Sequence, residues 1–348
     1  MKKTIKYYLP PVLALLLAVC VSSCHRRELD ADERVTVRFV IGDLMTKAGD
    51  IPSADEQCIN RWALLVFDTD GRRVAEGLSM DGSGIDAVLD AGVYTVCAVV
   101  NGVQSFSPAD YDALSALEQE VVSLEQNMTS SLVMFGKQSL SLSGGDNGTK
   151  SITVHRLVSK VGIRSIRVDD SGELAGRSVV MKAIYLTNVV RSSRLGSDVE
   201  SEALPLSRGG WYNTLGLHGG EAPVKQLDKL LYDGGIDETV SAASPYTSAH
   251  YFYPFPNTTA LEGDSNASTW SRRCTRLVVE AAIDGTVYYY PVTLPLMQRN
   301  HTYIISQAVI RRIGSLDPEG REGSAMDVTW SVTSEADWDV ATSITEES

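Results

Sequence analysis

Short apolar segments separated by turn residues run through most of the chain, and they restrict its fold to one rich in β-strands. The first segment alternates with period two, which is typical of a strand that buries one face. Its apolar positions are Val35, Val37, Phe39 and Ile41. Comparable segments lie at residues 59–67, 90–101, 151–154, 161–168, 179–188, 277–283, 286–290, 303–310 and 326–332. Short strands with turns between them predict an all-β fold made of β-sandwiches.

Few segments favour other structure. Residues 107–110, Ser-Pro-Ala-Asp, offer a helix cap, a first-turn proline and a first-turn acid, so we expect one helix that ends near residue 117 or 122. Residues 191–250 are rich in Gly, Ser, Asp and Pro and have weak periodicity, which predicts long loops. Asp284-Gly285 lies between two apolar segments and predicts a two-residue hairpin turn.

The first 24 residues have the composition of an export signal rather than of a folded element. Lysines stand near the start, and residues 9–21 form an apolar run too short to span a bilayer comfortably. The run ends in Val21-Ser22-Ser23-Cys24, which resembles the cleavage box of bacterial lipoproteins, whose cysteine becomes the lipidated first residue. We predict a signal peptide over residues 1–23 and lipid on Cys24. An ordinary signal peptide that ends near a cysteine stays open as the alternative.

Lipid on Cys24 would place the mature chain outside the cytoplasm and tether it to a membrane, with each buried methylene contributing about 0.8 kcal/mol. The net charge supports a lipid link over an electrostatic one. Removal of Lys2, Lys3 and Lys6 lowers the 31 basic residues to 28, against 44 acidic ones, a formal charge of −16. Nothing forms a basic stripe, so we expect no nucleic-acid partner.

The length after the signal peptide predicts two domains. About 325 residues remain, which is enough for two hydrophobic cores. The boundary is expected within residues 150–158. We therefore assign an N-terminal β-sandwich to residues 24–155 and a C-terminal one to residues 156–348, with long loops and one or two short helices.

The chain lacks the motifs of common catalytic and metal sites. It contains no His-Glu-x-x-His, no phosphate-binding loop and no nucleophile elbow, and its five histidines are not spaced as a metal pair. Residues 82–84, Gly-Ser-Gly, lack a strand-turn-helix context. Residues 68–71 lack the later glutamate of a calcium loop and predict a hairpin turn. We expect no enzyme, no metal and no cofactor, although the spacing of the acidic residues leaves a glycosidase pair open.

The cysteines do not form a recognisable framework. After the signal peptide they are Cys24, Cys58, Cys97 and Cys274, and no two have metal or redox spacing. Cys97 lies in an apolar strand pattern and is expected to be buried. A disulfide between Cys58 and Cys97 stays open.

Several motifs, taken in their order along the chain, resemble one family. They are the lipoprotein box, Thr46-Lys47-Ala48, Ile59-Asn60-Arg61-Trp62 with the strand that leads to Asp70-Gly71, Ala91-Gly92-Val93-Tyr94 with the strand that ends at Asn101, residues 155–161, Tyr185-Leu186-Thr187-Asn188-Val189, residues 299–305, residues 314–318, and Trp330 or Trp338. This order resembles the fimbrillins of Bacteroidetes, which are subunits of type V pili. The resemblance covers nearly the whole mature chain.

The resemblance implies two transthyretin-like β-sandwich domains in tandem and assembly by strand exchange. A trypsin-like protease removes the first strand, and the groove accepts a strand from another subunit. In this chain the removable strand would carry Val35, Val37, Phe39 and Ile41. The cut would fall at Lys47 and Ala48. The donor strand would carry Met326, Val328, Trp330 and Val332, after a Gly- and charge-rich connector at residues 312–323.

The implied partners are other pilus subunits, the outer membrane through the lipid of the precursor, and a host or bacterial surface receptor. A shaft subunit needs both a removable strand and a donor strand. An anchor would keep its lipid and remain uncut, and a tip would lack a donor. A monomeric surface lipoprotein that binds glycans or proteins is the alternative, and it would use the loops of residues 191–250 and an aromatic set. That set is Trp211, Tyr212, Tyr251, Phe252 and Tyr253.

Overall fold

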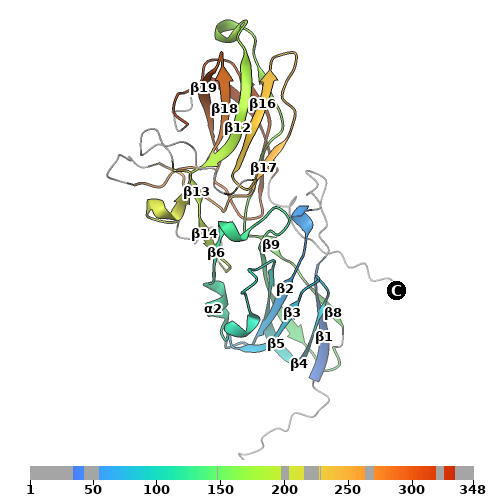
Figure 1. The fold of residues 1–348 in the computed structure, drawn as a ribbon. Coiled ribbons are helices and arrows are strands. Elements are labelled where there is room, and N and C mark those ends of the chain that lie inside the picture. Colours follow the sequence, from blue (N-terminus) through green and yellow to red (C-terminus); the bar gives the residue numbers. More distant parts are fainter. Residues whose placement is uncertain are drawn as a thin grey trace, which may run out of the picture.

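The structure is a computed structural model that describes residues 34–42, 55–146, 148–196, 204–214, 227, 229–262, 270–318 and 325–333. Strands predominate over helices in these residues (Figure 1), which confirms the predicted all-β fold. The strands are β1 (Arg34–Ile41), β2 (Trp62–Phe67), β3 (Arg73–Ser79), β4 (Ile85–Asp90), β5 (Gly92–Val100), β6 (Val121–Ser123), β7 (Met134–Leu142), β8 (Thr149–Ile152), β9 (His155–Arg156), β10 (Lys160–Ile163), β11 (Ile166–Val168), β12 (Val179–Thr187), β13 (Val189–Val190), β14 (Ser192–Arg194), β15 (Trp211–Tyr212), β16 (Tyr232–Val240), β17 (His250–Phe252), β18 (Arg276–Ile283), β19 (Thr286–Thr293), β20 (Thr302–Ile310) and β21 (Met326–Thr333).

The helices are all short. They are the α-helix α2 (Leu114–Glu118) and the 3-10 turns η2 (Asp55–Gln57), η3 (Pro108–Asp110), η4 (Leu124–Gln126), η5 (Gly172–Leu174) and η6 (Arg208–Gly210). The single helix expected after residue 107 is wrong in extent, since η3, α2 and the strand β6 share its residues. The backbone explains the break: Arg73 N donates to Asp112 O over 2.9 Å, and Ala113 has an extended φ of −130°. Pairing with β3 therefore interrupts the helix.

The first sandwich is built from residues before β10. One sheet has the strand order β4-β1-β8, and the other has the order β3-β2-β5-β7-β9. A buried cluster fills the space between them, with Trp62, Leu64 and Val66 from β2 and Ile85 and Leu89 from β4. The strand β2 is buried on both faces, because its alternate residues join a second cluster beneath the 102–133 segment. These layers occupy the lower part of Figure 1.

The second sandwich follows from β10 onward. One sheet has the order β11-β20-β10-β17 with β21 added on β20, and the other has the order β16-β12-β18-β19. Figure 1 shows β12, β16, β18 and β19 grouped at the end of the molecule opposite to β1. The change of sheets falls between Arg156 and Lys160. The domain limits 24–155 and 156–348 stay predictions.

Two local predictions have different outcomes. The hairpin at Asp284-Gly285 is confirmed: both residues have positive φ, 49° and 89°, which is the backbone of a type I′ turn between β18 and β19. The expectation of long loops throughout residues 191–250 is wrong for β16, a nine-residue strand. Its residues are largely exposed and Gly234 and Gly235 interrupt it, so its hydrophobic periodicity is weak.

Three asparagines of the sequence motifs lie just after or just before strands and adopt the left-handed region. Asn101, Asn188 and Asn300 have φ values of 54°, 56° and 57°. Asparagine tolerates this conformation better than most residues. The Asn101 side chain also donates to the carbonyl oxygens of Cys58 (2.7 Å) and Leu132 (3.1 Å), so it joins three loops. The motifs therefore mark sharp, buried turns of the scaffold.

Candidate functional site

The strand β1 lies at the centre of its three-stranded sheet. It pairs antiparallel with β4 from Arg34↔Asp90 to Phe39↔Ile85. On its other edge it pairs parallel with β8 from Arg38↔Thr149 to Ile41↔Ile152. Loss of β1 would therefore leave the facing edges of β4 and β8 without hydrogen-bond partners, and such edges readily accept another strand.

The inward face of β1 fills the core of the first sandwich. Val35, Val37 and Phe39 are each 0% exposed, and the half-buried Ile41 packs against the same cluster. The cluster includes Trp62, whose indole N–H donates to Ser83 O over 2.8 Å. Burial of the three fully enclosed side chains contributes roughly 5–9 kcal/mol gross, at about 1.5–3 kcal/mol each. The apolar face is thus the main attachment of this strand.

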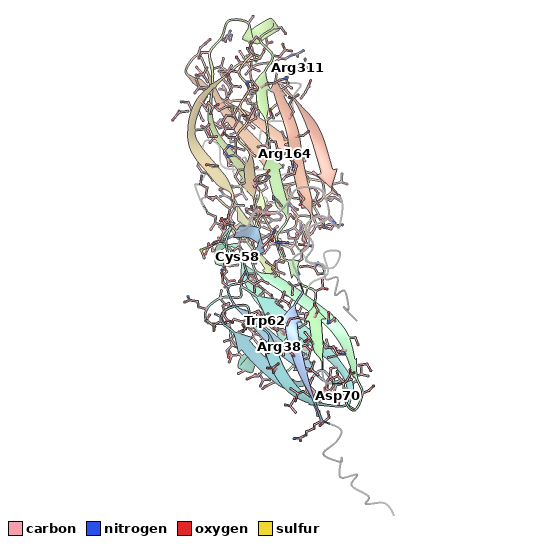
Figure 2. All side chains as sticks on the ribbon, turned by 90° about the vertical axis from the view of Figure 1, so that its right-hand side faces the viewer. Arg38, Cys58, Trp62, Asp70, Arg164 and Arg311 are labelled. Atoms are coloured by element: carbon pink, nitrogen blue, oxygen red, sulfur yellow. The ribbon has the colours of Figure 1, made fainter. Side chains whose placement is uncertain are left out.

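The outward face of β1 contributes little to the attachment of the strand. Arg38 Nη1 lies 3.2 and 3.1 Å from the two carboxylate oxygens of Asp86, and Arg34 Nε lies 3.3 Å from Asp90 Oδ1. About half or more of each arginine side chain is exposed. Figure 2 labels Arg38 on β1. Exposed ion pairs of this kind contribute about 0–1 kcal/mol each.

The predicted lipidation and cleavage residues, Cys24, Lys47 and Ala48, lie outside the described residues. The sequence around the cut is still informative, because Lys47 is the only lysine or arginine in residues 43–54. The chain is described again from η2 at Asp55.

A buried ionic cluster holds the chain directly after that segment. Glu56 is 1% exposed, and its carboxylate lies 2.9 Å from Lys160 Nζ and accepts from the Tyr253 hydroxyl over 2.5 Å. Arg156 donates to the Glu56 carbonyl over 2.9 Å. Burial is the largest of the causes that raise the pKa of Tyr253, followed by the Glu56 charge. The cluster fastens η2 to β9, β10 and the residue after β17.

Sequence reasoning did not predict this cluster, and it did not predict that β4 pairs with β1. The partners of Glu56 are 104 and 197 residues away along the chain, so no spacing could reveal them. A signal for β4 was present, because Ile85, Ala87 and Leu89 alternate with Asp86, Val88 and Asp90.

The predicted donor strand, β21, has a different environment. It pairs antiparallel with β20 from Ile310↔Met326 to Thr302↔Thr333, with a register shift near Ile305. Among the described strands it pairs only with β20, so it forms an edge. Met326 is half-buried and packs against the core. The backbones of Val328, Trp330 and Val332 pair with Ala308, Ile305 and Tyr303.

The aromatic set does not form an exposed platform. Trp211, Tyr212, Phe252 and Tyr253 are 1–4% exposed, and Tyr251 is half-buried. Trp211 lies beside Trp270, and the Tyr212 hydroxyl bonds to Glu125. These rings are core and packing residues.

The described part of the chain shows few other groups that could bind a metal or react. It contains no group of three or more His, Cys, Asp or Glu residues placed to hold a metal. No helix in the same residues is long and apolar enough to cross a membrane. Cys58, Cys97 and Cys274 form no disulfide with one another, and burial raises the pKa of the Cys97 thiol to about 12, so it is unreactive.

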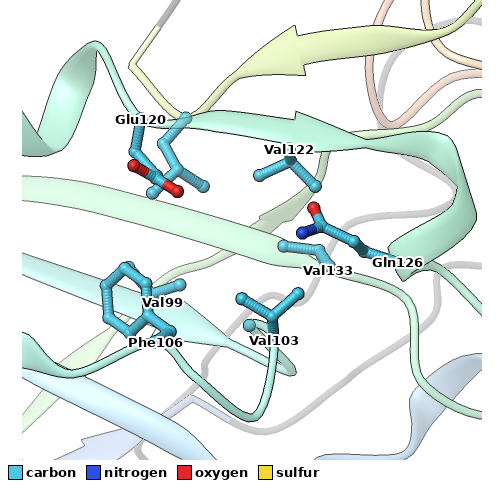
Figure 3. Close-up of a pocket in the computed structure, with 9 residues that line it drawn as sticks. Val99, Val103, Phe106, Glu120, Val122, Gln126 and Val133 are labelled. Atoms are coloured by element: carbon cyan, nitrogen blue, oxygen red, sulfur yellow. The ribbon is translucent and has the colours of Figure 1, made fainter.

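A small cavity opens beside the second cluster (Figure 3). It is lined mainly by apolar side chains, among them Val99, Val103, Phe106 and Val133, with Glu120 and Gln126 as its polar groups. The Gln126 side chain already accepts from Ser123 N over 2.8 Å as part of a helix cap. The cavity therefore holds one carboxylate and no second group for acid–base chemistry.

No protein-family model matches the chain, and no curated protein matches it. Solved structures do. A fimbrilin (fimA) from Porphyromonas gingivalis W83 aligns over 85% of this chain and 96% of its own, with 16% identity and a TM-score of 0.58. The chain has the fold of a fimbrillin.

Two further solved structures share the fimbrillin fold. A candidate cell adhesion protein from Bacteroides eggerthii aligns over 88% of this chain and 97% of its own, with 16% identity and a TM-score of 0.63. Another, from Parabacteroides distasonis, covers 90% and 99% with 13% identity and a TM-score of 0.58. The predicted fold class is confirmed over both sandwiches.

Proposed function

We propose that this chain is a structural subunit of a cell-surface fimbrium, that it polymerises by strand exchange after proteolysis, and that it has no catalytic step. The observation that carries the proposal is the position of β1. It is the first described strand, it fills the core with Val35, Val37 and Phe39, and it separates β4 from β8. A terminal strand is the one kind of central strand that a single cut in the chain can release.

The cut at Lys47 explains how exchange is controlled. While β1 is tethered through residues 43–54, its effective concentration at the groove is on the order of millimolar, so a donor from another subunit cannot compete. Cleavage removes this advantage, and a donor strand then adds to the sheet by β-augmentation. Arg38 is an unsuitable site because its backbone is paired on both sides, and a cut at Arg34 would leave the strand in place.

The chain carries features of both partners in the exchange, a removable strand and the edge strand β21 that can serve as donor. This combination favours a shaft or accessory subunit over an anchor, which would remain uncut, or a tip, which would lack a donor. The precursor would reach the outer membrane with lipid on Cys24, and other pilus subunits would be its partners. A surface receptor would be reached by the assembled fimbrium. The buried aromatic set gives the monomeric glycan-binding alternative less support.

Trypsin treatment of the mature chain, produced from residue 25 so that it carries no lipid, tests the proposal. We expect an early cut after Lys47 that releases β1, followed by ladders of oligomers on native mass spectrometry. Cuts at Arg26, Arg27 or Arg34 would leave β1 joined to the chain. The Lys47→Gln variant should keep β1 and stay monomeric, and Lys47→Arg should behave as the wild type. Clipped protein that remains monomeric at high concentration would rule out strand exchange, and the chain would then be better described as a monomeric surface protein.

A further inference from the structure

Release of β1 would leave a groove between β4 and β8. The geometry of this groove and the residue order of β21 together determine the direction and register in which a donor strand would bind. We infer that the donor strand runs in the same direction as β1 and that Trp330 occupies the place of Phe39. The inference rests on the proposed strand exchange and adds to it the polarity and register of the incoming strand. Both follow from two independent features of the molecule.

The first feature is the pair of ladders that β1 makes. The antiparallel ladder with β4 extends from Arg34 to Phe39, whereas the parallel ladder with β8 covers only Arg38 to Ile41. Antiparallel pairing is slightly more stable per residue. A donor in the direction of β1 keeps the longer ladder antiparallel, and a reversed donor makes it parallel.

The second feature is the order of side-chain sizes. With Trp330 at the position of Phe39 and the same direction, the other apolar residues also match. Met326, Val328 and Val332 then take the positions of Val35, Val37 and Ile41, and both strands span eight residues. The aromatic ring meets the one aromatic site, and a valine replaces a valine.

The reversed arrangements fit less well. If the reversed strand is aligned end to end, Trp330 falls on Val37, and a well-packed core accepts such an increase in size poorly. If it is shifted to bring Trp330 to Phe39, Ser334 falls on the fully buried Val35 position. Burial of that hydroxyl without a partner is unfavourable.

The inferred register also determines which charged side chains of the donor and of β4 come close together. Asp327 would lie where Thr36 now lies, opposite Val88 and between Asp86 and Asp90. These two carboxylates would lose Arg38 and Arg34 as ion-pair partners. A reversed donor would instead place Asp327 beyond the β4 ladder, which ends at Ile85.

Disulfide trapping tests the direction. Val88 is 61% exposed and lies on the outward face of β4, so Val88→Cys leaves the core untouched. It is combined in turn with Asp327→Cys, Thr329→Cys, Ser331→Cys or Thr333→Cys, all at outward positions of the alternation. After cleavage at Lys47, we expect covalent ladders on non-reducing gels from the Asp327 combination alone. The uncut double variant and the cleaved Val88→Cys single variant should show no covalent ladders on the same gels, which controls for the native cysteines.

Other outcomes are equally informative. Ladders from the Thr333 or Ser331 combination would show a reversed donor, and those from Thr329 a register shift of two; each would overturn this inference and leave strand exchange intact. Absence of any polymer, with or without the cysteines, would refute strand exchange itself.

Asp327→Asn gives a second measurement. It should speed assembly by about two- to fivefold more than Arg311→Ala, which breaks the same ion pair of the monomer; the additional factor is the range expected from one exposed charge interaction. An equal effect of the two variants would contradict the inferred register.

Discussion

The first and the last described strands of this chain look alike in sequence and differ in what holds them. Both have eight residues and alternate apolar with polar positions. The strand β1 pairs on both edges and buries its face in the centre of the first sandwich. Among the described strands, β21 pairs with β20 alone, at the margin of the second sandwich. Alternation therefore predicts that a strand can bury one face, but it does not predict how many strands will pair with it.

Under the proposed strand exchange, this difference suits the two strands to opposite roles. A strand held on both sides leaves a deep vacancy when it is lost, so β1 suits the part that is replaced. A strand held on one side can leave its sheet with fewer broken interactions, so β21 suits the part that is donated. The same chain would then carry a replaceable strand in one sandwich and a donor strand in the other.

Deletion of each strand should give the largest contrast. Loss of residues 34–41 removes roughly 5–9 kcal/mol of gross apolar burial, at about 1.5–3 kcal/mol for each enclosed side chain, which rivals the whole stability of a domain. We expect that variant to aggregate or to unfold its first sandwich. Deletion of residues 326–333 should leave a folded monomer that cannot polymerise. Circular dichroism and size-exclusion chromatography measure both, and a monomeric, fully stable variant without β1 would undo the contrast.

Single substitutions within β1 should grade the effect by burial. Phe39→Ala removes a ring that is 0% exposed, and we expect a loss of about 3–5 kcal/mol in the free energy of unfolding. Ile41→Ala, at the half-buried end of the strand, should cost about 1–2 kcal/mol because less area is buried. Urea unfolding of the uncut chain gives both values. Equal costs would mean that β1 is not anchored through its centre.

The buried cluster around Glu56 should keep the groove in shape after the cut. Lys160→Met leaves the Glu56 carboxylate buried without the Lys160 ammonium, and we expect a loss of about 3 kcal/mol. The double variant with Glu56→Gln should recover part of this loss, since a neutral amide then replaces the buried carboxylate. Urea unfolding measures both. A Lys160→Met variant as stable as the wild type would show that the segment before β2 is held by other contacts.

The sequence predicts some strands of this molecule directly and misses others. The strand β1 and the hairpin at Asp284-Gly285 follow from alternation and turn chemistry. Among the longer strands that sequence reasoning missed, β3, β4 and β16 lie at sheet edges, whereas β7 lies between β5 and β9. The strands β3 and β16 are partly exposed, so their hydrophobic pattern is weak. In β3 a glycine, Gly77, also takes a position where a Cβ would lie 2.3 Å from Ile85.

The candidate site was predictable only in part. The alternation of residues 35–41 marks the removable strand, because burial of one face leaves a periodic trace. The pairing of β1 with β4 and β8 leaves no such trace, since register between distant segments is decided by the whole fold. The same holds for Glu56 and Tyr253, which meet although 197 residues separate them.

The smallest expected effect concerns the attachment of β21. Arg311 bonds to Asp327 of β21 and lies 3.1 Å from Asp169 Oδ2, so it ties the donor strand to the residue after β11. Arg311→Ala should weaken this attachment by about 0–1 kcal/mol, because the groups are exposed. Polymerisation of the clipped chain should then be up to about fivefold faster, since release of β21 precedes donation.

Arg177→Ala is the matched control for this last effect. Arg177 pairs with Asp284 over 3.3 Å at a similarly exposed site in the second sandwich, and this partner lies in the turn between β18 and β19 rather than in β21. Light scattering after trypsin addition compares the two rates. If both variants accelerate assembly equally, the cause is a general loosening of the sandwich. If Arg311→Ala alone does so, departure of the edge strand limits the rate, and the single-sided pairing of β21 is what makes it a donor.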